Sequence, residues 1–526
     1  MIKKTLANSF IQLCVIYSVL IAVMYFGVIS RYALHFQIFA LIIAVLGIFA
    51  ISQYEEIKVS KKLYYALFAL AILTIIALRV IPYLNSNIPL GYDAGIYQYA
   101  IEHGLARNDA WIVTGPTMEP AFLYLMEPLK LFFSADFIIK WIFILSIVIL
   151  GLALYWCTKL YFGKTPALIS LLFYSVSVTQ FLTFTFMYFR NVLGLALMLF
   201  SICFLKRYQL INRKKYLYLF IIFGGILGAV HRPTFYILGL SYFFYTFAVG
   251  WREKYDFKKY FTYVLYGIII LLIAVSFYIG RFWPAISTVI EPVASSFVDT
   301  GESPGTFISF KQYQFLTLAY FTFALIGIFS LLKKRKFNFL VIWALINASI
   351  VYFQLFFFNR FIIHLDIILL MFVGLGFSLL IQEKKWLGVG VLALLFISSA
   401  YIITKESLSA KNQIITEEDL SVIKELSITT EQNSMIISFS KEYSPWILAY
   451  SNRTIIAPGL FDENKWNESE WNTFWYGADE QKTIELMNQY NTTRPIYIYT
   501  GTKSFNNACF NKFLGKNGRN VYEYVC

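Results

Sequence analysis

Long apolar segments alternate with short polar ones along the first 404 residues of the chain. A helix needs about 20 mainly apolar residues to cross the hydrocarbon core of a bilayer, and windows of about that length recur here. The pattern therefore predicts about thirteen membrane spans. They lie near residues 9–30, 33–52, 62–81, 137–162, 166–187, 190–206, 216–231, 234–250, 258–280, 312–332, 337–358, 361–381 and 386–404.

Basic residues gather in every second connection between these windows. Lys3 and Lys4 precede the first window, and Lys333-Lys-Arg-Lys336 follows the tenth. Cytoplasmic loops carry an excess of Lys and Arg, so the alternation predicts a cytoplasmic N-terminus. It also predicts that a first loop at 82–119, a second loop at 281–311 and everything after residue 404 face outward.

The segment after the first outer loop is apolar but too short to cross a membrane. Residues 120–133 are mostly apolar, with Glu127 and Lys130 set among them. Such a segment is typical of a helix that lies along the membrane surface. We therefore expect the first outer loop and an interfacial helix to occupy residues 82–136 of a transmembrane domain that spans residues 1–404.

The tail, residues 405–526, has the pattern of a small extracytoplasmic α/β domain. Thr416-Glu-Glu-Asp419 resembles a capping box that opens a helix through Leu426. Residues 479–490 are expected to form a second helix. The strands are expected at Met435–Phe439, Thr454–Ala457, Ile496–Thr500 and Val521–Val525.

Cysteine and asparagine positions add two conditional features to the tail. Cys509 and Cys526 could form a disulfide if the tail lies outside the cytosol. Asn452, Asn467 and Asn491 each begin an Asn-x-Ser/Thr triplet, which is a glycan acceptor only in a host with that pathway. Cys14, Cys157 and Cys203 lie in apolar windows and are expected to be core residues.

Composition supports a multi-pass membrane protein and excludes a soluble one. The 526 residues are 59% hydrophobic and 14% charged, with a mean hydropathy of +0.63. A soluble chain of this length could not cover so much apolar surface. The N-terminus resembles a signal peptide but lacks a cleavage site with small residues, so we interpret it as a retained first helix.

The net charge of +14 is unevenly distributed along the chain. Residues 405–526 hold 12 basic and 15 acidic residues, which leaves 32 basic and 15 acidic residues in the first 404. The excess therefore belongs to the membrane part, where it indicates orientation and phosphate binding and not a nucleic-acid partner. No Cys/His cluster has the spacing of a zinc site, and the sequence predicts no cofactor.

The first outer loop contains the candidate catalytic acid, Asp93, in the motif Gly91-Tyr92-Asp93. A carboxylate retained near a bilayer is a functional candidate, because its burial is unfavourable. Asp is equally a favoured N-cap, so Asp93 could merely cap a helix that starts at Ala94. Glu119, beside a proline at the end of the loop, is a second candidate base.

Basic side chains also occur at the predicted outer ends of spans, where orientation does not require them. A guanidinium suits a phosphate by charge and by its forked geometry. Snorkelling or pairing with a nearby acid is the alternative for any one of them. The candidate phosphate-binding residues are Arg190, His231, Arg232, Arg281, Arg360 and His364.

Together these residues suggest transfer of a sugar from a lipid-linked phosphate. A carboxylate would take a proton from an acceptor hydroxyl, which then attacks the anomeric carbon as the lipid phosphate leaves. The arginines would stabilise the charge on the departing phosphate. Tyr92 and Tyr97 would offer aromatic faces to the sugar.

The motifs resemble the membrane glycosyltransferases of the GT-C superfamily, which use polyprenyl-phosphate sugars such as dolichyl-phosphate donors. Gly91-Tyr92-Asp93 is similar to their first outer loop, whose acidic residue is the base. Asn359-Arg360-Phe361 is similar to an Arg-Tyr-Leu-x-Pro pattern whose Arg faces the lipid phosphate. Gly224 to Thr234 resembles a Gly-rich span that ends in a basic-Pro turn. Met118-Glu119 stand where protein O-mannosyltransferases and aminoarabinose transferases often have His before Pro.

The resemblance extends less fully to the oligosaccharyltransferases of the same superfamily. Thr288-Val-Ile-Glu291 in the second outer loop is loosely similar to their Thr-Ile-x-Glu motif, which makes Glu291 a candidate. Phe474 to Gly477 is only faintly similar to their Trp-Trp-Asp-Tyr-Gly. The missing Asp, and the lack of an Asp-x-Asp pair in the second loop, argue against that assignment and against a divalent metal.

We therefore predict an inverting glycosyltransferase, with a hexose or pentose donor on a polyprenyl phosphate. Its partners would be a glycan, lipid or protein acceptor and membrane lipids, in cell-envelope glycan assembly or protein glycosylation. The alternatives are an oligosaccharyltransferase-like enzyme and a lipid-linked glycan transporter or flippase. A transporter should show inverted repeats, and the sequence shows no convincing repeat.

Overall fold

The computed structural model describes residues 2–27, 33–50, 54–57, 59–84, 86–103, 118–252, 257–279, 308–333, 338–355, 357–409, 414–458, 461, 463–477, 479–490 and 493–526. The chain folds into two compact units. The first comprises Met1–Pro82, Phe143–Phe184 and Tyr188–Ala410, and the second comprises Tyr83–Ile142, Thr185–Met187 and Lys411–Cys526. The segment after the third predicted span is thus grouped with the C-terminal residues.

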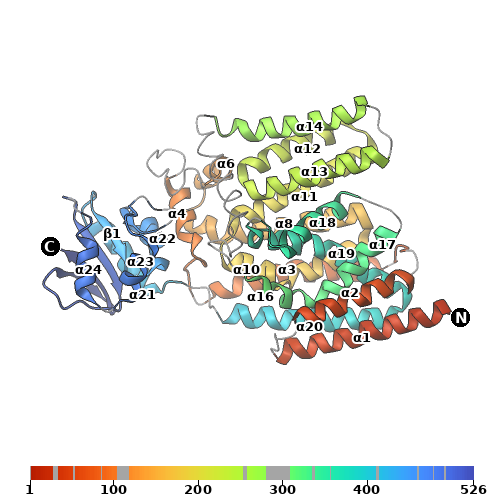
Figure 1. Ribbon diagram of the computed structural model, residues 1–526, viewed down its shortest axis with the longest axis horizontal. Helices are drawn as coiled ribbons and strands as arrows, with labels where there is room; N and C mark the ends of the chain where they lie inside the picture. The colour runs from red at the N-terminus through yellow and green to blue at the C-terminus, as the bar shows by residue number, and fades with distance from the viewer. Residues whose placement is uncertain are drawn as a thin grey trace. The chain divides into compact units, whose positions relative to one another are not determined.

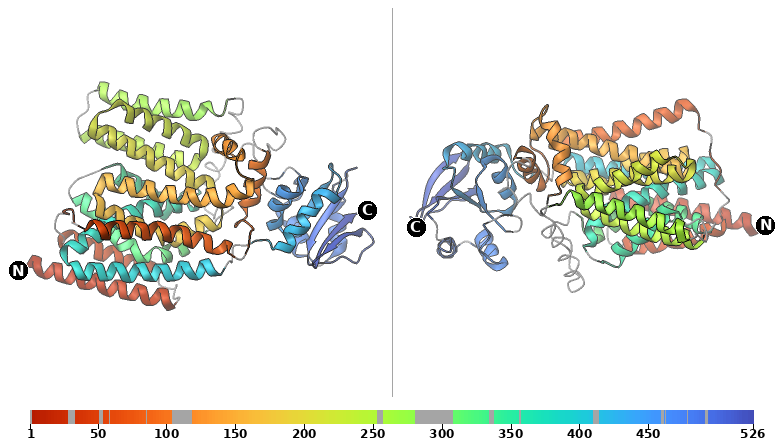
Figure 2. Two further views of the ribbon diagram at one scale, coloured as in Figure 1. Left: turned by 180° about the vertical axis from the view of Figure 1, so that it is seen from behind. Right: turned by 90° about the horizontal axis from the view of Figure 1, so that it is seen from above.

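The first unit is a bundle of long helices (Figures 1 and 2). Its first half contains α1 (Ile2–Gly27), α2 (Ala33–Ala50), α3 (Lys61–Val80), α8 (Phe143–Phe162), α9 (Lys164–Ser175), α10 (Val178–Thr185), α11 (Phe189–Ile211) and α12 (Lys214–Val230). Its second half contains α13 (Arg232–Arg252), α14 (Phe257–Ser276), α16 (Phe310–Leu316), α17 (Leu318–Lys333), α18 (Phe339–Tyr352), η4 (Phe358–Phe361), α19 (Ile362–Glu383) and α20 (Lys385–Leu408).

Helix α19 lies at the centre of this bundle, and its apolar window is fully buried. Glycines let neighbouring backbones approach it closely, as in many membrane helix pairs. A Cβ atom on Gly374 would lie 2.0 Å from the carbonyl oxygen of Pro166 in α9. One on Gly376 would lie 1.9 Å from that of Phe323 in α17. Helices α9, α17 and α19 therefore pack backbone against backbone.

The prediction of a polytopic helical membrane protein is confirmed. Among the described residues, seven helices are long and apolar enough to cross a membrane, or nine if each of two bent pairs is one span. The expected span at 166–187 is broken between α9 and α10, with a bend of 49°. The one at 312–332 is bent by 79° between α16 and α17. The count of thirteen spans stays a prediction.

The second unit combines the first loop with the C-terminal domain. From the loop come α4 (Asp93–His103), α6 (Pro120–Lys130), α7 (Ala135–Phe137) and a π-helical turn at Ile138–Ile142. The C-terminal domain contributes α21 (Glu417–Thr429), β1 (Met435–Ser438), η5 (Lys441–Tyr443), α22 (Ser444–Ser451), β2 (Thr454–Ile456), α23 (Glu468–Tyr476), α24 (Glu480–Met487), β3 (Ile496–Gly501), β4 (Phe510–Lys516) and β5 (Arg519–Tyr524). A helix was expected at 120–133, and α6 occupies most of that range.

The C-terminal domain is the expected small α/β fold (Figure 1). Its five-stranded sheet has the order β2-β1-β3-β5-β4, with β1 parallel to β2 and β3 and with β5 antiparallel to β3 and β4. On one face, Ile496 and Ile498 pack into an aromatic core that includes Trp466 and Phe474. On the other face, Tyr499 donates to Asp419 of α21 at 2.6 Å.

The capping box at the start of α21 is confirmed. Thr416 accepts from the amide of Asp419, and the Asp419 carboxylate accepts from the amide of Thr416. Asp419 also accepts from Tyr499 and from Arg519 of β5, so one buried carboxylate joins α21 to the sheet. Burial raises the pKa of Asp419, but the hydrogen bonds from Tyr499, Thr416 and Arg519 outweigh it and the pKa is lowered overall.

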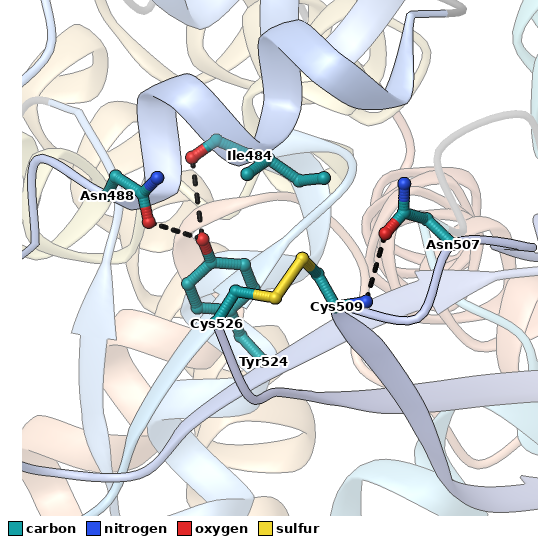
Figure 3. Close-up of a disulfide and its surroundings, with 6 residues drawn as sticks. All are labelled: Ile484, Asn488, Asn507, Cys509, Tyr524 and Cys526. Atoms are coloured by element: carbon teal, nitrogen blue, oxygen red, sulfur yellow. Dashed lines mark hydrogen bonds between the residues drawn. A yellow bond between two sulfur atoms is a disulfide. The ribbon is translucent and has the colours of Figure 1, made fainter.

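The expected disulfide between Cys509 and Cys526 is present (Figure 3). Cys509 immediately precedes β4, and Cys526 follows β5, so the bond closes the β4–β5 hairpin. The amide of Val525 donates to the carbonyl of Cys509 at 3.0 Å, and Tyr524 donates to Asn488, the C-cap of α24, at 2.6 Å. The hairpin is thereby fixed to the helix that covers it.

Replacing both cysteines, Cys509→Ser with Cys526→Ser, should destabilise the C-terminal domain by about 3 kcal/mol, because the bond closes a loop of 17 residues. The measurement is limited proteolysis of the full-length protein in detergent across a urea series. Cleavage after residue 405 should begin at lower urea in the double variant. Cys157→Ala is the control, and an unshifted cleavage profile in the double variant would contradict the prediction.

Candidate functional site

The Gly91-Tyr92-Asp93 motif has a conformation that requires its glycine. Gly91 has φ +84°, and a Cβ atom there would lie 2.8 Å from the carbonyl carbon of Phe186 and 2.9 Å from the carbonyl oxygen of Thr185. Only glycine combines this φ with so close an approach to another backbone. Gly91 therefore fixes the point at which α4 begins.

Asp93 is the first residue of α4 and is half-buried. The residues that follow it, from Ala94 to Ile101, are all buried. A carboxylate in the first helical turn is stabilised by the unpaired amides and the positive end of the helix dipole. This position is compatible both with a helix-stabilising role and with a half-buried base at the start of a buried helix.

Glu119 lies at the corresponding end of the neighbouring helix. It is the N-cap residue of α6 and is 3% exposed. Tyr97, one turn after Asp93, contacts Phe122, three residues after Glu119, with ring centroids 5.4 Å apart. The structure therefore places both candidate bases at the N-terminal ends of two helices that pack together.

Tyr92 is held as a neutral phenol beside Asp93. Burial raises its pKa, and the charges of Asp93 and Glu442 raise it further. Glu442 comes from η5 of the C-terminal domain, so the surroundings of the motif include a residue that sequence reasoning did not single out.

The C-terminal domain packs directly against α4. A Cβ atom on Gly95 would lie 2.5 Å from the carbonyl of Pro445 in α22. Tyr450 of α22 donates to Asp136 at 2.6 Å, and Ser86 donates to Glu417 at 3.2 Å. The position of Asp93 therefore depends on helix α22, a contact that the sequence did not predict.

In the first unit, two of the candidate phosphate-binding residues are joined by a threonine. Nδ1 of His231, at the end of α12, lies 2.7 Å from Oγ1 of Thr234. The same Oγ1 lies 2.8 Å from Nε2 of His364 in α19. A Cβ atom on Gly194 of α11 would lie 2.8 Å from Cβ of His231. Three helix ends thus meet at one His-Thr-His cluster, defined as His231, Thr234 and His364.

Three candidate arginines lie close to this cluster in the chain. Arg190 is four residues before Gly194 at the start of α11, and it is half-buried. Arg232, the first residue of α13, directly follows His231 and is also half-buried. Arg360 is four residues before His364, in η4, and is exposed. The contacts of the cluster thus bring these helix ends, and their arginines, to one end of the bundle.

A second buried polar group lies deeper in the bundle, on α19. Asp366 accepts hydrogen bonds from Ser177 at 2.9 Å, from Gln180 at 2.8 Å and from Tyr320 of α17. Ser177 lies in the break between α9 and α10. A buried carboxylate is tolerated when several donors surround it.

Sequence reasoning missed Arg79, which is fully buried near the end of α3. It donates to the carbonyl oxygen of Ser175 at 3.3 Å, and its guanidinium lies over the ring of Phe181. The sequence could have identified it, because Arg79 is the only charged residue in the outer half of the third apolar window.

Two predicted site residues, Arg281 and Glu291, lie outside the described residues. Within the ranges that the structure describes, no group of three or more His, Cys, Asp or Glu side chains could hold a metal ion.

The central part of the chain matches the model of a known family. The model of the family described as dolichyl-phosphate-mannose-protein mannosyltransferase matches residues 115–279, less than a third of the chain. The matched region contains Glu119, Arg190, His231 and Arg232. No curated protein sequence matches the chain.

Solved structures share the fold at low sequence identity. The oligosaccharyltransferase AglB from Archaeoglobus fulgidus, in complex with an inhibitory peptide and a dolichol-phosphate, has a TM-score of 0.57 at 14% identity, over 84% of this chain and 70% of that one. ArnT from Cupriavidus metallidurans has a TM-score of 0.56 in the apo state, at 11% identity over 88% and 97% of the two chains. Bound to undecaprenyl phosphate, ArnT gives 0.53 at 11% identity over 89% and 99%.

These findings confirm the resemblance that the motifs suggested. The shared architecture covers more than four fifths of this chain, and the family match adds a glycosyltransferase signature to its central helices. The chain is a multi-pass membrane protein that is similar to a mannosyltransferase family over residues 115–279 and shares the fold of AglB and ArnT.

Proposed function

We propose that this enzyme is an inverting transferase that moves a sugar from a polyprenyl-phosphate donor to an acceptor hydroxyl on the outer face of the membrane. The observation that carries the proposal is the position of Asp93 in the first turn of α4, where it is half-buried ahead of the buried residues from Ala94 to Ile101. The matched family is named for a dolichyl-phosphate-linked donor, and one ArnT structure holds undecaprenyl phosphate, which supports a lipid-linked donor here.

In this proposal Asp93 accepts the proton of the acceptor hydroxyl. The hydroxyl oxygen then forms a bond to the anomeric carbon from the face opposite the phosphate. The bond between the anomeric carbon and the phosphate oxygen breaks, and its electron pair leaves with the lipid phosphate. Glu119, at the start of the adjacent helix, is the competing base. Tyr92 and Tyr97 are proposed to contact the sugar.

The arginines around the His-Thr-His cluster are proposed to bind the phosphate. Each of these arginines lies at the start of a helix, where the backbone amides also favour an anion. They are Arg190 in α11, Arg232 in α13 and Arg360 in η4. Charge-assisted hydrogen bonds are strongest to the departing phosphate, because its charge increases as the bond breaks. The site then stabilises the transition state more than the bound donor.

A second candidate is transfer of a whole oligosaccharide to a peptide. The similarity to AglB, whose structure holds a peptide and dolichol-phosphate, favours it. The sequence opposes it, because Phe474-Trp475-Tyr476-Gly477 lacks the Asp of the corresponding motif. Transfer of label only from a lipid-linked oligosaccharide would favour this second candidate.

Orientation is tested by cysteine labelling with an impermeant reagent on intact cells. We expect Lys482→Cys, exposed on α24, to label without permeabilisation, because the basic loops predict an outward C-terminal domain. The matched control is Lys384→Cys, exposed between α19 and α20, which should label only after permeabilisation. Labelling of Lys384→Cys on intact cells, with labelling of Lys482→Cys only after permeabilisation, would contradict the proposed topology.

The reaction is tested with membranes that contain the enzyme and a panel of radiolabelled polyprenyl-phosphate sugars. We expect one label to move to an acceptor and Asp93→Asn to lower the rate by about 10²–10⁴, the usual effect of removing a positioned base. Donor binding should persist. If Asp93 only stabilises the helix start, Asn should replace it with little loss.

Glu119→Gln, assayed beside Asp93→Asn, separates the two carboxylates. Loss of transfer in Glu119→Gln with full activity in Asp93→Asn would transfer the role of base to Glu119. Full activity in both folded variants would end the case for a carboxylate base in this loop.

Arg360→Ala should weaken donor binding by about tenfold to a hundredfold, because a hydrogen bond to a charged group contributes roughly 1.5–3 kcal/mol. Arg360→Lys should restore it only in part, since the planar fork is lost. Arg213→Ala is the control, an exposed arginine in the predicted cytoplasmic connection after α11. Equal donor affinity in Arg360→Ala and the wild-type enzyme would reject the assignment.

A further inference from the structure

The His-Thr-His cluster carries information about the tautomer of each histidine. Thr234 lies between the two rings, with Oγ1 at 2.7 Å from Nδ1 of His231 and at 2.8 Å from Nε2 of His364. A hydroxyl has one proton to donate, so it can donate to only one of the two rings and must accept from the other. The direction of this chain of hydrogen bonds decides where His231 carries its proton.

The backbone of Thr234 fixes that direction. Its amide N–H also points to Nδ1 of His231, at 3.4 Å. An amide nitrogen can only donate, so Nδ1 carries the lone pair and the hydroxyl of Thr234 donates to it as well. Oγ1 then accepts from Nε2–H of His364. It follows that neutral His231 carries its proton on Nε2.

The surroundings leave His231 little freedom to adopt another orientation. Its side chain is 9% exposed, while Thr234 and His364 are fully buried. Gly194 of α11 lies directly against it, where any larger residue would collide with Cβ of His231 and would approach Oγ1 of Thr234 to 3.3 Å. A ring held on both sides in this way is oriented before any ligand arrives, which lowers the loss of entropy on binding.

We propose that Thr234 and His364 are positioning residues that hold His231 as the Nε2–H tautomer, so that it donates a hydrogen bond to the phosphate of the lipid-linked sugar. This inference rests on the proposed function. A neutral imidazole N–H can bind a phosphate oxygen without bringing a second full charge into the apolar bundle, where charges are costly. Its bond strengthens as the phosphate departs, so its main effect falls on kcat.

The test is a double-mutant cycle on transfer from the polyprenyl-phosphate sugar that the wild-type enzyme uses. Thr234→Val keeps the shape of the side chain and removes the hydroxyl, and we expect kcat to fall by about tenfold to a hundredfold with a smaller change in KM. Thr234→Ser restores the hydroxyl and should recover most of the rate. His364→Phe should resemble Thr234→Val.

The second arm of the cycle separates positioning from general packing. In a His231→Gln background, the side-chain amide of the glutamine donates to the phosphate whether or not Thr234 has its hydroxyl. Thr234→Val should therefore cause little further loss of rate. Binding of free polyprenyl phosphate, measured separately from binding of the sugar-linked donor, shows whether the bond forms to the product, to the donor or to both. Thr158→Val is the control, a buried threonine that donates to Leu154 in its own helix, and it should keep full activity.

Equal losses from Thr234→Val in both backgrounds, or no loss in either, would overturn the positioning role. The positioning role is also overturned if Thr234→Ser fails to recover the rate although its thermal unfolding in detergent shows that the variant is folded. A wild-type enzyme that moves no label from any polyprenyl-phosphate sugar would instead refute the proposed function itself. The two failures are therefore distinguishable.

Discussion

A carboxylic acid buried among apolar helices must be surrounded by hydrogen-bond donors, and the bundle is arranged so that Asp366 has three. Ser177 comes from the break between α9 and α10, Gln180 from the first turn of α10, and the third donor is Tyr320 of α17. The interruption of a membrane helix frees backbone groups and is unfavourable unless other groups bind them. Asp366 therefore binds the broken helix to the central helix α19.

The same arrangement requires close contact between backbones. Gly374 and Gly376 allow α9 and α17 to approach α19 so closely that any side chain on these glycines would collide with a carbonyl group. Short distances between helix axes bring Tyr320 and Ser177 within reach of Asp366. Two residues before Asp366 in α19, His364 contacts Thr234, and the absence of a side chain on Gly194 leaves room for this cluster.

Periodicity and charge predicted the helical membrane part, because a span needs only length and apolarity. Each predicted window coincides with a helix or a bent pair of helices. The sequence did not predict the bend between α9 and α10, because Val176 and Ser177 interrupt neither the apolar pattern nor the helical period. In the tail, alternation identified four strands, but β4 was missed because its Asn511 and two lysines make it look like a loop.

The candidate site was predicted residue by residue, but not its internal contacts. Asp93 was conspicuous as an acid between aromatic and small residues, and Arg360 as a charge at the start of an apolar window. Thr234 gave no signal, because a threonine after a proline is unremarkable in a sequence. Its importance follows only from the distances to two histidines that are 133 residues apart in the chain. Tertiary hydrogen bonds of this kind leave no periodic pattern.

The packing of α4 against α22 has a consequence for the exchange of domains between related enzymes. Gly95 lies so close to the carbonyl of Pro445 that a change in either surface requires a matching change in the other. Tyr450 and Glu417 form hydrogen bonds with residues of the same loop as α4. A chimaera that replaces only the C-terminal tail would present α4 with a foreign surface and displace the helix that begins at Asp93. The transferable module is instead residues 83–142 together with residues 185–187 and 411–526. Recombination at those boundaries preserves the contacts between α4 and α22, so the effect of the exchanged unit can be measured on an unchanged membrane bundle.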